Sequence, residues 1–412
     1  MSDASSSAGA TTAVSSFSHR WLGLDALRGL TIAAMILVNN PGRWGNEYQY
    51  APLEHAAWHG CTFTDIVFPT FLFCAGVAIV PAFGKKLEQG VARGPLVAGI
   101  GKRVLSLVLL GMFLSAFPLV TFAKVADWAD VDWADVDWEA IFSPLLQTRF
   151  PGVLQRIGVC YGIAALLFLF CKRRTLWWVL VACLAVYWPL LTLCPTPDGG
   201  SPNLDSTSDH LAGWLDRTVF GDHVWRQTRG QYDPEGLLST MPAVATALFG
   251  VAAGCVLHSG DDLAAKVATL LRRGALLMAA GAVWGWFFPI NKALWTSSYA
   301  VWTAGIATVA LGLSVWAFEV RGWRRLARPL QVYGVNALLV FVGSGVLGRI
   351  VGSLVTVTAF GKSVAVKEWF FHTVLLPIGD PKLASLAFAL LWVAGWYAVL
   401  ALLFRRGIVW KV

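Results

Sequence analysis

The chain has 412 residues, of which 57% are hydrophobic and only 14% are charged. Soluble domains are about 45–50% apolar, so this composition excludes an ordinary soluble globular protein. The net charge of +8 does not indicate a nucleic-acid partner, because the basic residues cluster in alternate short loops, as in membrane proteins. The sequence therefore predicts an all-α fold, a polytopic transmembrane helical bundle in contact with the lipid bilayer.

An N-terminal tail precedes ten apolar segments that are long enough to cross a bilayer. Residues 1–20 are rich in Ser, Ala and Thr and have no basic cluster ahead of a hydrophobic core. This pattern predicts a disordered tail rather than a cleavable signal peptide. Residues 21–412 are expected to form one transmembrane domain. Its predicted spans are 25–41, 61–83, 97–122, 152–171, 176–194, 239–257, 272–290, 295–317, 332–350 and 383–404.

The charges of the connecting loops orient these spans. Acidic residues gather in the two long loops at 123–150 and 195–238, which we expect to be periplasmic. Basic residues gather in the alternate loops, so both termini are predicted to be cytoplasmic, in a bacterial inner membrane. The basic residues are Lys85, Lys86, Arg93, Lys102 and Arg103 after span two, Lys172, Arg173 and Arg174 after span four, Lys266, Arg272 and Arg273 after span six, Arg321, Arg324, Arg325 and Arg328 after span eight, and Arg405, Arg406 and Lys411 after span ten.

Two segments do not follow the pattern of spans and loops. Residues 351–382 are half apolar, and a further span there would place the positively charged C-terminus outside, so we predict a re-entrant or interfacial periplasmic segment. Residues 127–138 read DWADVDWADVDW, with Asp-Trp recurring every five residues. Five matches neither the helical nor the strand period. These tryptophans are interpreted as interfacial anchors or as platforms for stacking a carbohydrate.

Charged residues inside apolar spans are candidates for a functional site, because they are costly in a membrane. Asp25 and Arg28 share one helix face near the cytoplasmic end of span one. They form either a structural ion pair or part of a cofactor-binding site. Asp65 and Arg156 enter spans two and four at a similar depth from the outer face. We expect them to pair, which would hold the two helices in register.

Further polar residues are expected at the same outer face of the bundle. Asn39 and Asn40 close span one, where an asparagine caps a helix end or polarises a carbonyl. The segment FFPINKALWTSS, with Asn291, Lys292 and Trp295, is either a tight turn or a substrate-facing wall. His55 follows in HAAWHG, and a histidine at this place can accept a proton from an amine or carry an acyl group.

Four stretches together resemble the heparan-α-glucosaminide N-acetyltransferase family and its bacterial relatives. They run in the family's order from residue 24 to about residue 340. The stretches are LDALRGLTIAAMILVNNPG with HAAWHGCTFTDIVFPTFLF, RFPGVLQRIGVCYGIAAL, YDPEGLLSTMPAVATALFGVAAG, and FPINKALWTSSYAVWTAGIATVALG with YGVNALLVF. The resemblance implies a homodimeric transmembrane acetyltransferase that uses cytosolic acetyl-CoA, without a metal, to acetylate a glucosamine-type amine on the far side.

The resemblance also implies roles for particular residues. His55 takes the place of the catalytic histidine in the family motif H-A-x-W-N-G, as general base or acetyl carrier, and Asn39 matches the family asparagine that holds the thioester or oxyanion. His59 stands where the motif has its asparagine. The remaining expected substrate-binding residues are Trp58, His59, Asp65, Arg156, Asn291, Lys292 and Trp295, and the expected cofactor-binding residues are Asp25, Arg28 and Asn40.

One alternative function stays open. Some bacterial relatives carry the label of N-acetylglucosamine transporter, and a transporter of this or a related amino sugar would move its substrate without acetyl-CoA. The sequence contains no P-loop and no GxGxxG helix start that would mark a nucleotide site. It also contains no convincing internal repeat, which transporters often show. The acceptor sugar and the choice between direct transfer and an acetyl-histidine intermediate are not determined by the sequence.

Overall fold

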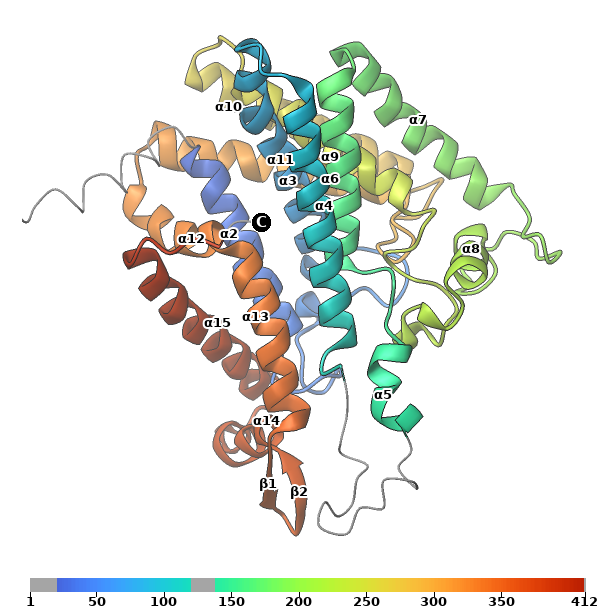
Figure 1. The fold of residues 1–412 in the computed structure, drawn as a ribbon, viewed down its shortest axis with the longest axis vertical. Coiled ribbons are helices and arrows are strands. Elements are labelled where there is room, and N and C mark those ends of the chain that lie inside the picture. Colours follow the sequence, from blue (N-terminus) through green and yellow to red (C-terminus); the bar gives the residue numbers. More distant parts are fainter. Residues whose placement is uncertain (1–20, 120–137, 411–412) are drawn as a thin grey trace, which may run out of the picture.

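The computed structural model describes residues 21–119 and 138–410, which are almost entirely helical (Figure 1). The predicted tail at 1–20 and the Asp-Trp repeat up to residue 137 lie outside the described residues. Ten of the described helices are long and apolar enough to span a membrane, as predicted. They are α2 (Leu22–Asn39), α3 (Phe63–Glu88), α4 (Arg93–Ala116), α6 (Val153–Phe170), α7 (Arg173–Thr192), α9 (Thr240–Leu257), α10 (Leu263–Trp284), α11 (Ser297–Val315, continued to Val320), α13 (Ala337–Arg349, continued to Leu354) and α15 (Pro381–Arg405).

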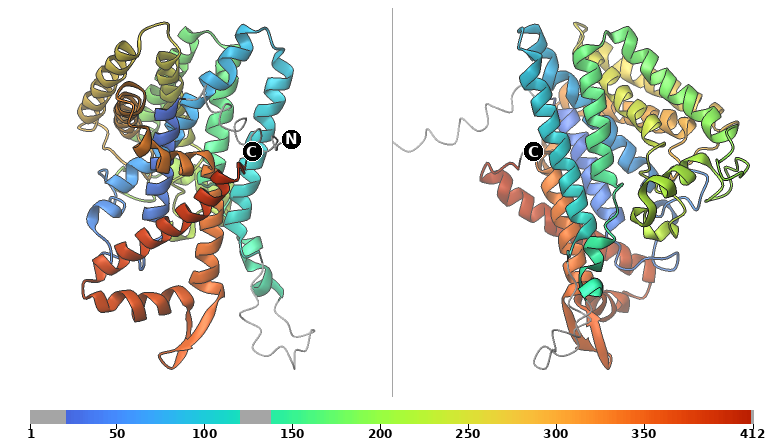
Figure 2. Two further views of the ribbon diagram at one scale, coloured as in Figure 1. Left: turned by 90° about the vertical axis from the view of Figure 1, so that its left-hand side faces the viewer. Right: turned by 45° about the vertical axis from the view of Figure 1, so that its right-hand side comes forward.

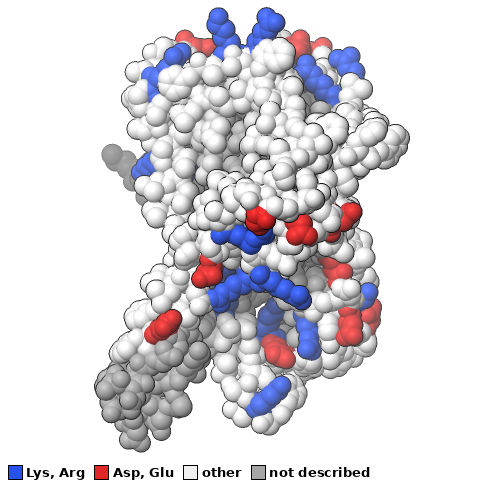
Figure 3. Space-filling model, turned by 90° about the vertical axis from the view of Figure 1, so that its right-hand side faces the viewer, with Lys and Arg blue, Asp and Glu red and all other residues white. Residues whose placement is uncertain are grey.

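Shorter elements connect these helices. The elements are α5 (Trp138–Leu146), α8 (Leu211–Phe220), α12 (Arg324–Val335), α14 (Val366–Phe370), β1 (Thr356–Ala359) and β2 (Lys362–Ala365). Figure 1 shows the turns α3–α4, α6–α7 and α9–α10 at one end of the bundle. These turns carry three of the five basic groups that the sequence assigns to one side, so we refer to this as the basic end. In Figure 3, basic side chains line one rim above a broad belt of uncharged residues, and mixed charges occupy the other half.

The seventh span begins nine residues earlier than predicted. Helix α10 starts at Leu263, because the Asp262 side chain caps it by accepting a hydrogen bond from the Ala265 N–H at 2.7 Å. Arg272 and Arg273 are therefore within the helix rather than in the preceding loop. Arginine stems cover apolar surface while the guanidinium reaches a polar region, which lowers the cost of placing two arginines within a membrane-spanning helix.

The predicted span at 332–350 is divided between two helices. Helix α12 ends and α13 begins at Asn336, whose side chain donates to the Ile408 carbonyl at 3.1 Å and accepts from the Trp410 N–H at 2.9 Å. Asn336 therefore fixes the C-terminal segment to the helix break. Residues 351–382 form the β1–β2 hairpin, in which Thr356 pairs with Ala365, followed by short helical turns. The hairpin extends beyond the end of α13 (Figure 1).

Helix α3 lies at the centre of the bundle and packs most extensively on α9. Their close approach depends on glycine: a Cβ atom on Gly76 would lie 2.0 Å from the Ala247 carbonyl oxygen, and one on Gly250 would lie 2.1 Å from the Phe73 oxygen. Small residues at a crossing are typical of membrane helix pairs, because they let the backbones pack directly. Helix α15 runs obliquely at one edge of the bundle (Figure 2). The α3–α9 contact fixes the helix that begins at the candidate site.

Candidate active site

A histidine–aspartate pair lies at the end of the bundle away from the basic turns. The His55 Nδ1 atom is 2.6 Å from Oδ1 of Asp65, at the start of α3. The Asp65 side chain is 1% exposed, whereas the His55 side chain is 51% exposed. A carboxylate can only accept here, so Nδ1 carries the proton and Nε2 has a free lone pair. Within the described residues, Nε2 has no hydrogen-bond partner, so it is available to accept a proton from a ligand.

The local sequence explains why Asp65 has this position. Thr62 and Asp65 form a capping box at the start of α3, a common device for satisfying the first N–H groups of a helix. The Asp65 Oδ2 atom accepts from the Thr62 N–H at 2.9 Å and the Ala56 N–H at 3.1 Å. The Thr62 hydroxyl lies 3.0 Å from Oδ2 and 2.6 Å from the Glu54 carbonyl oxygen. The two backbone donors on Oδ2 leave Oδ1 for His55. The same carboxylate therefore starts the helix and orients the imidazole.

The predicted Asp65–Arg156 pair is wrong. Within the described residues, Asp65 pairs with His55, and the Arg156 guanidinium donates to the Gly236 carbonyl at 2.7 Å and the Ser239 hydroxyl at 2.5 Å. Similar depth along two helices does not fix which faces meet, and Asp65 already has a local partner ten residues away. The Nε and Nη1 atoms of the buried Arg156 have no partner among the described residues.

Tyr299 and Trp295 connect these two charged groups. The Tyr299 hydroxyl donates to the backbone oxygen of Asp65 at 2.6 Å, and its ring packs edge-on against Trp295. The Arg156 guanidinium lies over the Trp295 ring, 5.2 Å from its centroid. Trp295 is 0% exposed, so its indole supports Asp65 and Arg156 rather than offering a face to a sugar in this conformation. Tyr299 was not among the residues singled out by sequence.

The other histidine of the motif faces the segment between α7 and α9. The His59 Nε2 atom is 2.9 Å from Asp205, and its Nδ1 atom is 3.2 Å from the buried Asn291 amide. Trp58 donates its indole N–H to the Leu204 carbonyl at 2.7 Å. Trp58 and His59 thus join the loop after α2 to the 193–239 segment, next to the His55–Asp65 pair in sequence.

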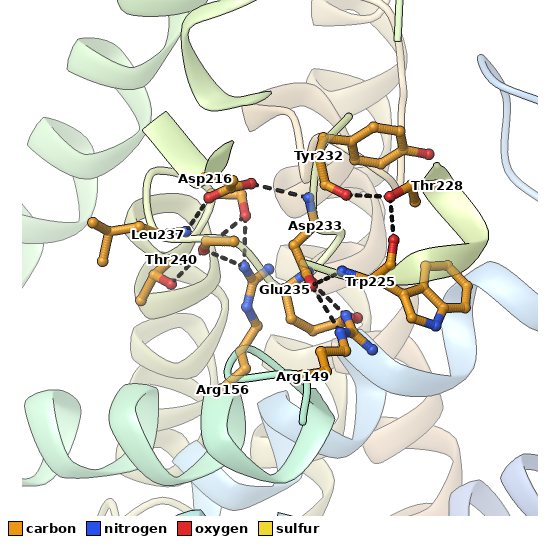
Figure 4. Close-up of polar contacts among 12 residues, drawn as sticks. Arg149, Arg156, Asp216, Trp225, Thr228, Tyr232, Asp233, Glu235, Leu237 and Thr240 are labelled. Carbon is orange, nitrogen blue, oxygen red and sulfur yellow. Dashed lines mark hydrogen bonds and ion pairs between the residues drawn. The ribbon is translucent and has the colours of Figure 1, made fainter. Parts of the chain in front are cut away.

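A buried ion cluster lies between the start of α6 and the segment before α9 (Figure 4). Arg149 forms a two-point ion pair with Asp233, in which Nε donates to Oδ2 at 2.7 Å, and also contacts Glu235. The Lys292 ammonium is 4.0 Å from Glu235. Burial alone would raise the pKa of Glu235, but Arg149 and Lys292 hold it well below its usual value. The cluster therefore carries both signs of charge away from water.

Asp216 lies beside this cluster and accepts hydrogen bonds from backbone N–H groups. It accepts from the Asp233 N–H at 3.0 Å and the Leu237 N–H at 2.9 Å, which fixes the turn before α9 (Figure 4). Burial raises the pKa of Asp216 to about 6. A signal for the cluster is visible in the sequence, since an acidic YDPEG and a basic RFPG each precede an apolar span. Sequence spacing could not show that Arg149 pairs with residues more than 80 positions away.

Asn39 lines a large cavity in the outer half of the bundle. The cavity has a volume of about 720 Å³ and lies between α2, α4, α6, α13 and α15. Asn40 also lines it, and its amide donates to the Ile36 carbonyl at 2.8 Å and to the Ser344 hydroxyl at 3.3 Å. His55 is not among the lining residues. The structure therefore places Asn39 at this cavity, whereas His55 lies in the loop that follows α2 and contacts Asp65.

Asp25 and Arg28 form the ion pair expected from their spacing. The Arg28 Nη2 atom is 2.9 Å from Asp25, and its Nε atom donates to the Gly334 carbonyl of α12 at 2.9 Å. This pair joins α2 to α12. Among the described residues, no group of three or more His, Cys, Asp or Glu side chains could hold a metal ion.

Comparison with known proteins finds two similar curated proteins and one matching family model. Residues 20–198 match the family model "Heparan-alpha-glucosaminide N-acetyltransferase, catalytic". The matched range contains Asn39, His55, Asp65 and Arg156. The heparan-alpha-glucosaminide N-acetyltransferase of Mus musculus is 28% identical over 381 residues, which covers 81% of this chain and 54% of the mouse protein. The human protein (Homo sapiens) is 29% identical over 383 residues, with the same coverage.

The chain is thus similar to the heparan-alpha-glucosaminide N-acetyltransferase family model over residues 20–198 and to the mouse and human proteins over most of its length. It spans about half the length of the curated relatives that it matches. The family resemblance inferred from the four sequence stretches is thereby confirmed, and so is the prediction of a multi-pass membrane protein. The family match ends at residue 198, so the ion cluster around Asp233 and Glu235 lies partly beyond it.

Proposed function

We propose that this chain is a transmembrane acetyltransferase. It would transfer the acetyl group of acetyl-CoA to the amine of a glucosamine-type sugar. The observation that carries the proposal is the His55–Asp65 pair, with a 2.6 Å contact at Nδ1 and an open Nε2 atom. A buried carboxylate that holds one imidazole nitrogen as a donor makes the other nitrogen a base. The homology to N-acetyltransferases supports the same chemistry.

The proposed reaction uses His55 as a general base. The sugar nitrogen attacks the thioester carbonyl carbon, a C–N bond forms and the C–S bond breaks. His55 Nε2 accepts the proton that the amine loses, and the CoA thiolate leaves and takes up a proton. In the other version, Nε2 attacks first and carries the acetyl group, which gives ping-pong kinetics. The Asn39 amide would stabilise the oxyanion in either version.

The surroundings of the pair support two substrate routes. The cavity lined by Asn39 and Asn40 has room for part of a CoA thioester, and Asp25 with Arg28 would order the α2–α12 contact on the donor side. Trp58, His59 and Lys292 line the acceptor side in this proposal. The fully buried Asn291 and Trp295, together with Arg156, would hold that side in place from behind.

The proposal includes an orientation and an assembly state. The basic end would face the cytoplasm and the His55 end the periplasm of a bacterium, with both termini cytoplasmic, because the positive-inside rule places arginine-rich loops inside. The chain would form a homodimer, which light scattering of the purified protein can measure. A monomer that retains full activity would contradict the dimer and leave the enzyme proposal intact.

The decisive experiment supplies purified protein in nanodiscs with radiolabelled acetyl-CoA and glucosamine. Labelled N-acetylglucosamine is expected from the wild type and none above background from His55→Ala. His258→Ala, at the end of α9 and outside the proposed site, is the matched histidine variant that retains transfer. Transfer that survives in His55→Ala would contradict the assignment of the base. No transfer to any amino sugar, together with acetyl-CoA-independent uptake in proteoliposomes, would overturn the enzyme and establish an amino-sugar transporter.

A further inference from the structure

A second cavity lies at the basic end of the bundle, far along the chain from His55. Its volume is about 340 Å³, and it is lined by residues of α7, α9 and α10. Helix α9 packs against both α7 and α10 and contributes the floor. It shares no lining residue with the cavity at Asn39. We refer to this second cavity as the α7–α10 groove.

The walls of the α7–α10 groove are apolar along most of its length. Leu176 and Leu180 come from α7, and Leu248, Val251 and Val256 come from α9. All five lie within helices that are long and apolar enough to span a membrane. Helices α7 and α10 bury little of their surface inside the protein, in contrast to α9, so their outer faces are free to contact lipid. A ligand in this groove would therefore contact apolar side chains on one side and lipid acyl chains on the other.

Three arginines converge on the same groove. Arg173 is the first residue of α7, and Arg272 and Arg273 lie about 14 Å along α10 from its first residue, at 1.5 Å per residue. Among the described residues, no carboxylate lies within ion-pair distance of any of them. Asp261 also lines the groove and accepts from the Ser259 hydroxyl at 2.7 Å. The groove thus carries three positive charges against one negative charge.

The positive-inside rule explains basic residues in loops, but it does not explain this arrangement. Arg272 and Arg273 are inside a membrane helix, where an unpaired cation is costly. They meet Arg173 from a different helix at one cavity. Guanidinium groups bind phosphate in a two-point geometry, and basic pockets between membrane helices on the cytoplasmic side bind anionic lipid headgroups. The charges and the apolar walls together fit one class of ligand.

We propose that the α7–α10 groove binds one anionic phospholipid. Its phosphate is held between Arg173 and the Arg272–Arg273 pair, and its acyl chains lie on the leucine and valine floor. Ser259 and Thr269, which also line the groove, can donate to a glycerol or headgroup oxygen. The lipid joins α7 to α10 and so stabilises the side of the bundle that packs on α9. This proposal does not depend on the acetyltransferase reaction.

The test compares lipids of equal chain length and different charge. Purified protein is incubated with dioleoyl-phosphatidylglycerol or dioleoyl-phosphatidylcholine, and retained lipid is counted by native mass spectrometry while thermal unfolding is followed in parallel. Wild type is expected to retain one phosphatidylglycerol and to unfold at a higher temperature with it. Arg272→Gln/Arg273→Gln is expected to weaken retention at least about tenfold, the effect of losing one charge-assisted hydrogen bond.

Two matched variants distinguish binding at this groove from non-specific attraction of an anionic lipid to basic residues. Lys85→Gln/Lys86→Gln removes two basic residues at the same end of the bundle but outside the groove, and retention is expected to match the wild type. Arg272→Lys/Arg273→Lys keeps the charge and is expected to retain most of the preference. Equal retention of the two lipids by the wild type would overturn the proposal. So would displacement of phosphatidylglycerol by acetyl-CoA, which would assign the groove to a nucleotide phosphate.

Discussion

The Asp65→Asn variant tests the roles of both members of the His55–Asp65 pair. In the structure, Oδ2 of Asp65 accepts hydrogen bonds from the backbone N–H groups of Thr62 and Ala56, and Oδ1 faces His55. An asparagine has one acceptor oxygen, and the two backbone donors around Oδ2 retain it there. Its NH₂ group then faces Nδ1 of His55. That contact is favourable only if Nδ1 accepts, so the imidazole proton moves to Nε2.

The expected result is a loss of activity without a loss of fold. Nε2 becomes a donor and can no longer take a proton from the amine, so kcat should fall by about 10²- to 10⁴-fold, the usual contribution of a positioned general base. The helix cap survives, because the asparagine oxygen still accepts from the donors that Asp65 Oδ2 used. Thermal unfolding should therefore change little. Alanine would be less informative, since losing a cap costs about 1 kcal/mol on its own.

The assay is initial-rate transfer of label from acetyl-CoA to glucosamine, with unfolding temperature measured on the same preparations. Asp205→Asn is the matched control, because it makes the same change in the other histidine–aspartate pair, where Asp205 is 85% exposed and 2.9 Å from His59. We expect the control to stay within about twofold of wild type, as typical for an exposed ion pair. Wild-type activity in Asp65→Asn would refute the argument that this carboxylate sets the imidazole tautomer.

Three further predictions concern stability. Arg149→Gln leaves Asp233 and Glu235 buried without their cation and should lower the free energy of unfolding by about 3–5 kcal/mol, measurable by denaturant titration. Arg149 and Lys292 hold the pKa of Glu235 below its usual value. Ionised Glu235 therefore adds to the free energy of unfolding above the ordinary glutamate pKa, and this stabilisation is lost as the pH falls through the pKa of the folded state. Unfolding temperatures that do not fall on acidification would contradict this. Gly76→Leu should cost more than the usual 1–3 kcal/mol of overpacking, because its Cβ meets backbone on α9.

Local properties of the sequence determined the spans and the candidate base. Hydropathy and length are local, so ten spans could be counted without knowing how they pack. The motif around His55 was visible because its residues are consecutive. The earlier start of α10 shows the limit of this reasoning. A count of apolar residues leaves arginine outside a predicted span, but the helix is capped at Asp262 and so includes Arg272. Helix boundaries follow hydrogen bonds as well as polarity.

Only the tertiary structure shows which charged side chains pair with one another. Asp65 and Arg156 have similar depth in sequence, but depth along an axis does not specify rotation about it. The structure turns Asp65 toward His55 and Arg156 toward the turn before α9. Arg149 pairs with carboxylates more than 80 residues away because the fold places the start of α6 against the segment before α9. The sequence by itself determined which segments are long and apolar enough to span a membrane and which residues are candidates for catalysis. Helix packing decided which of these side chains are in contact.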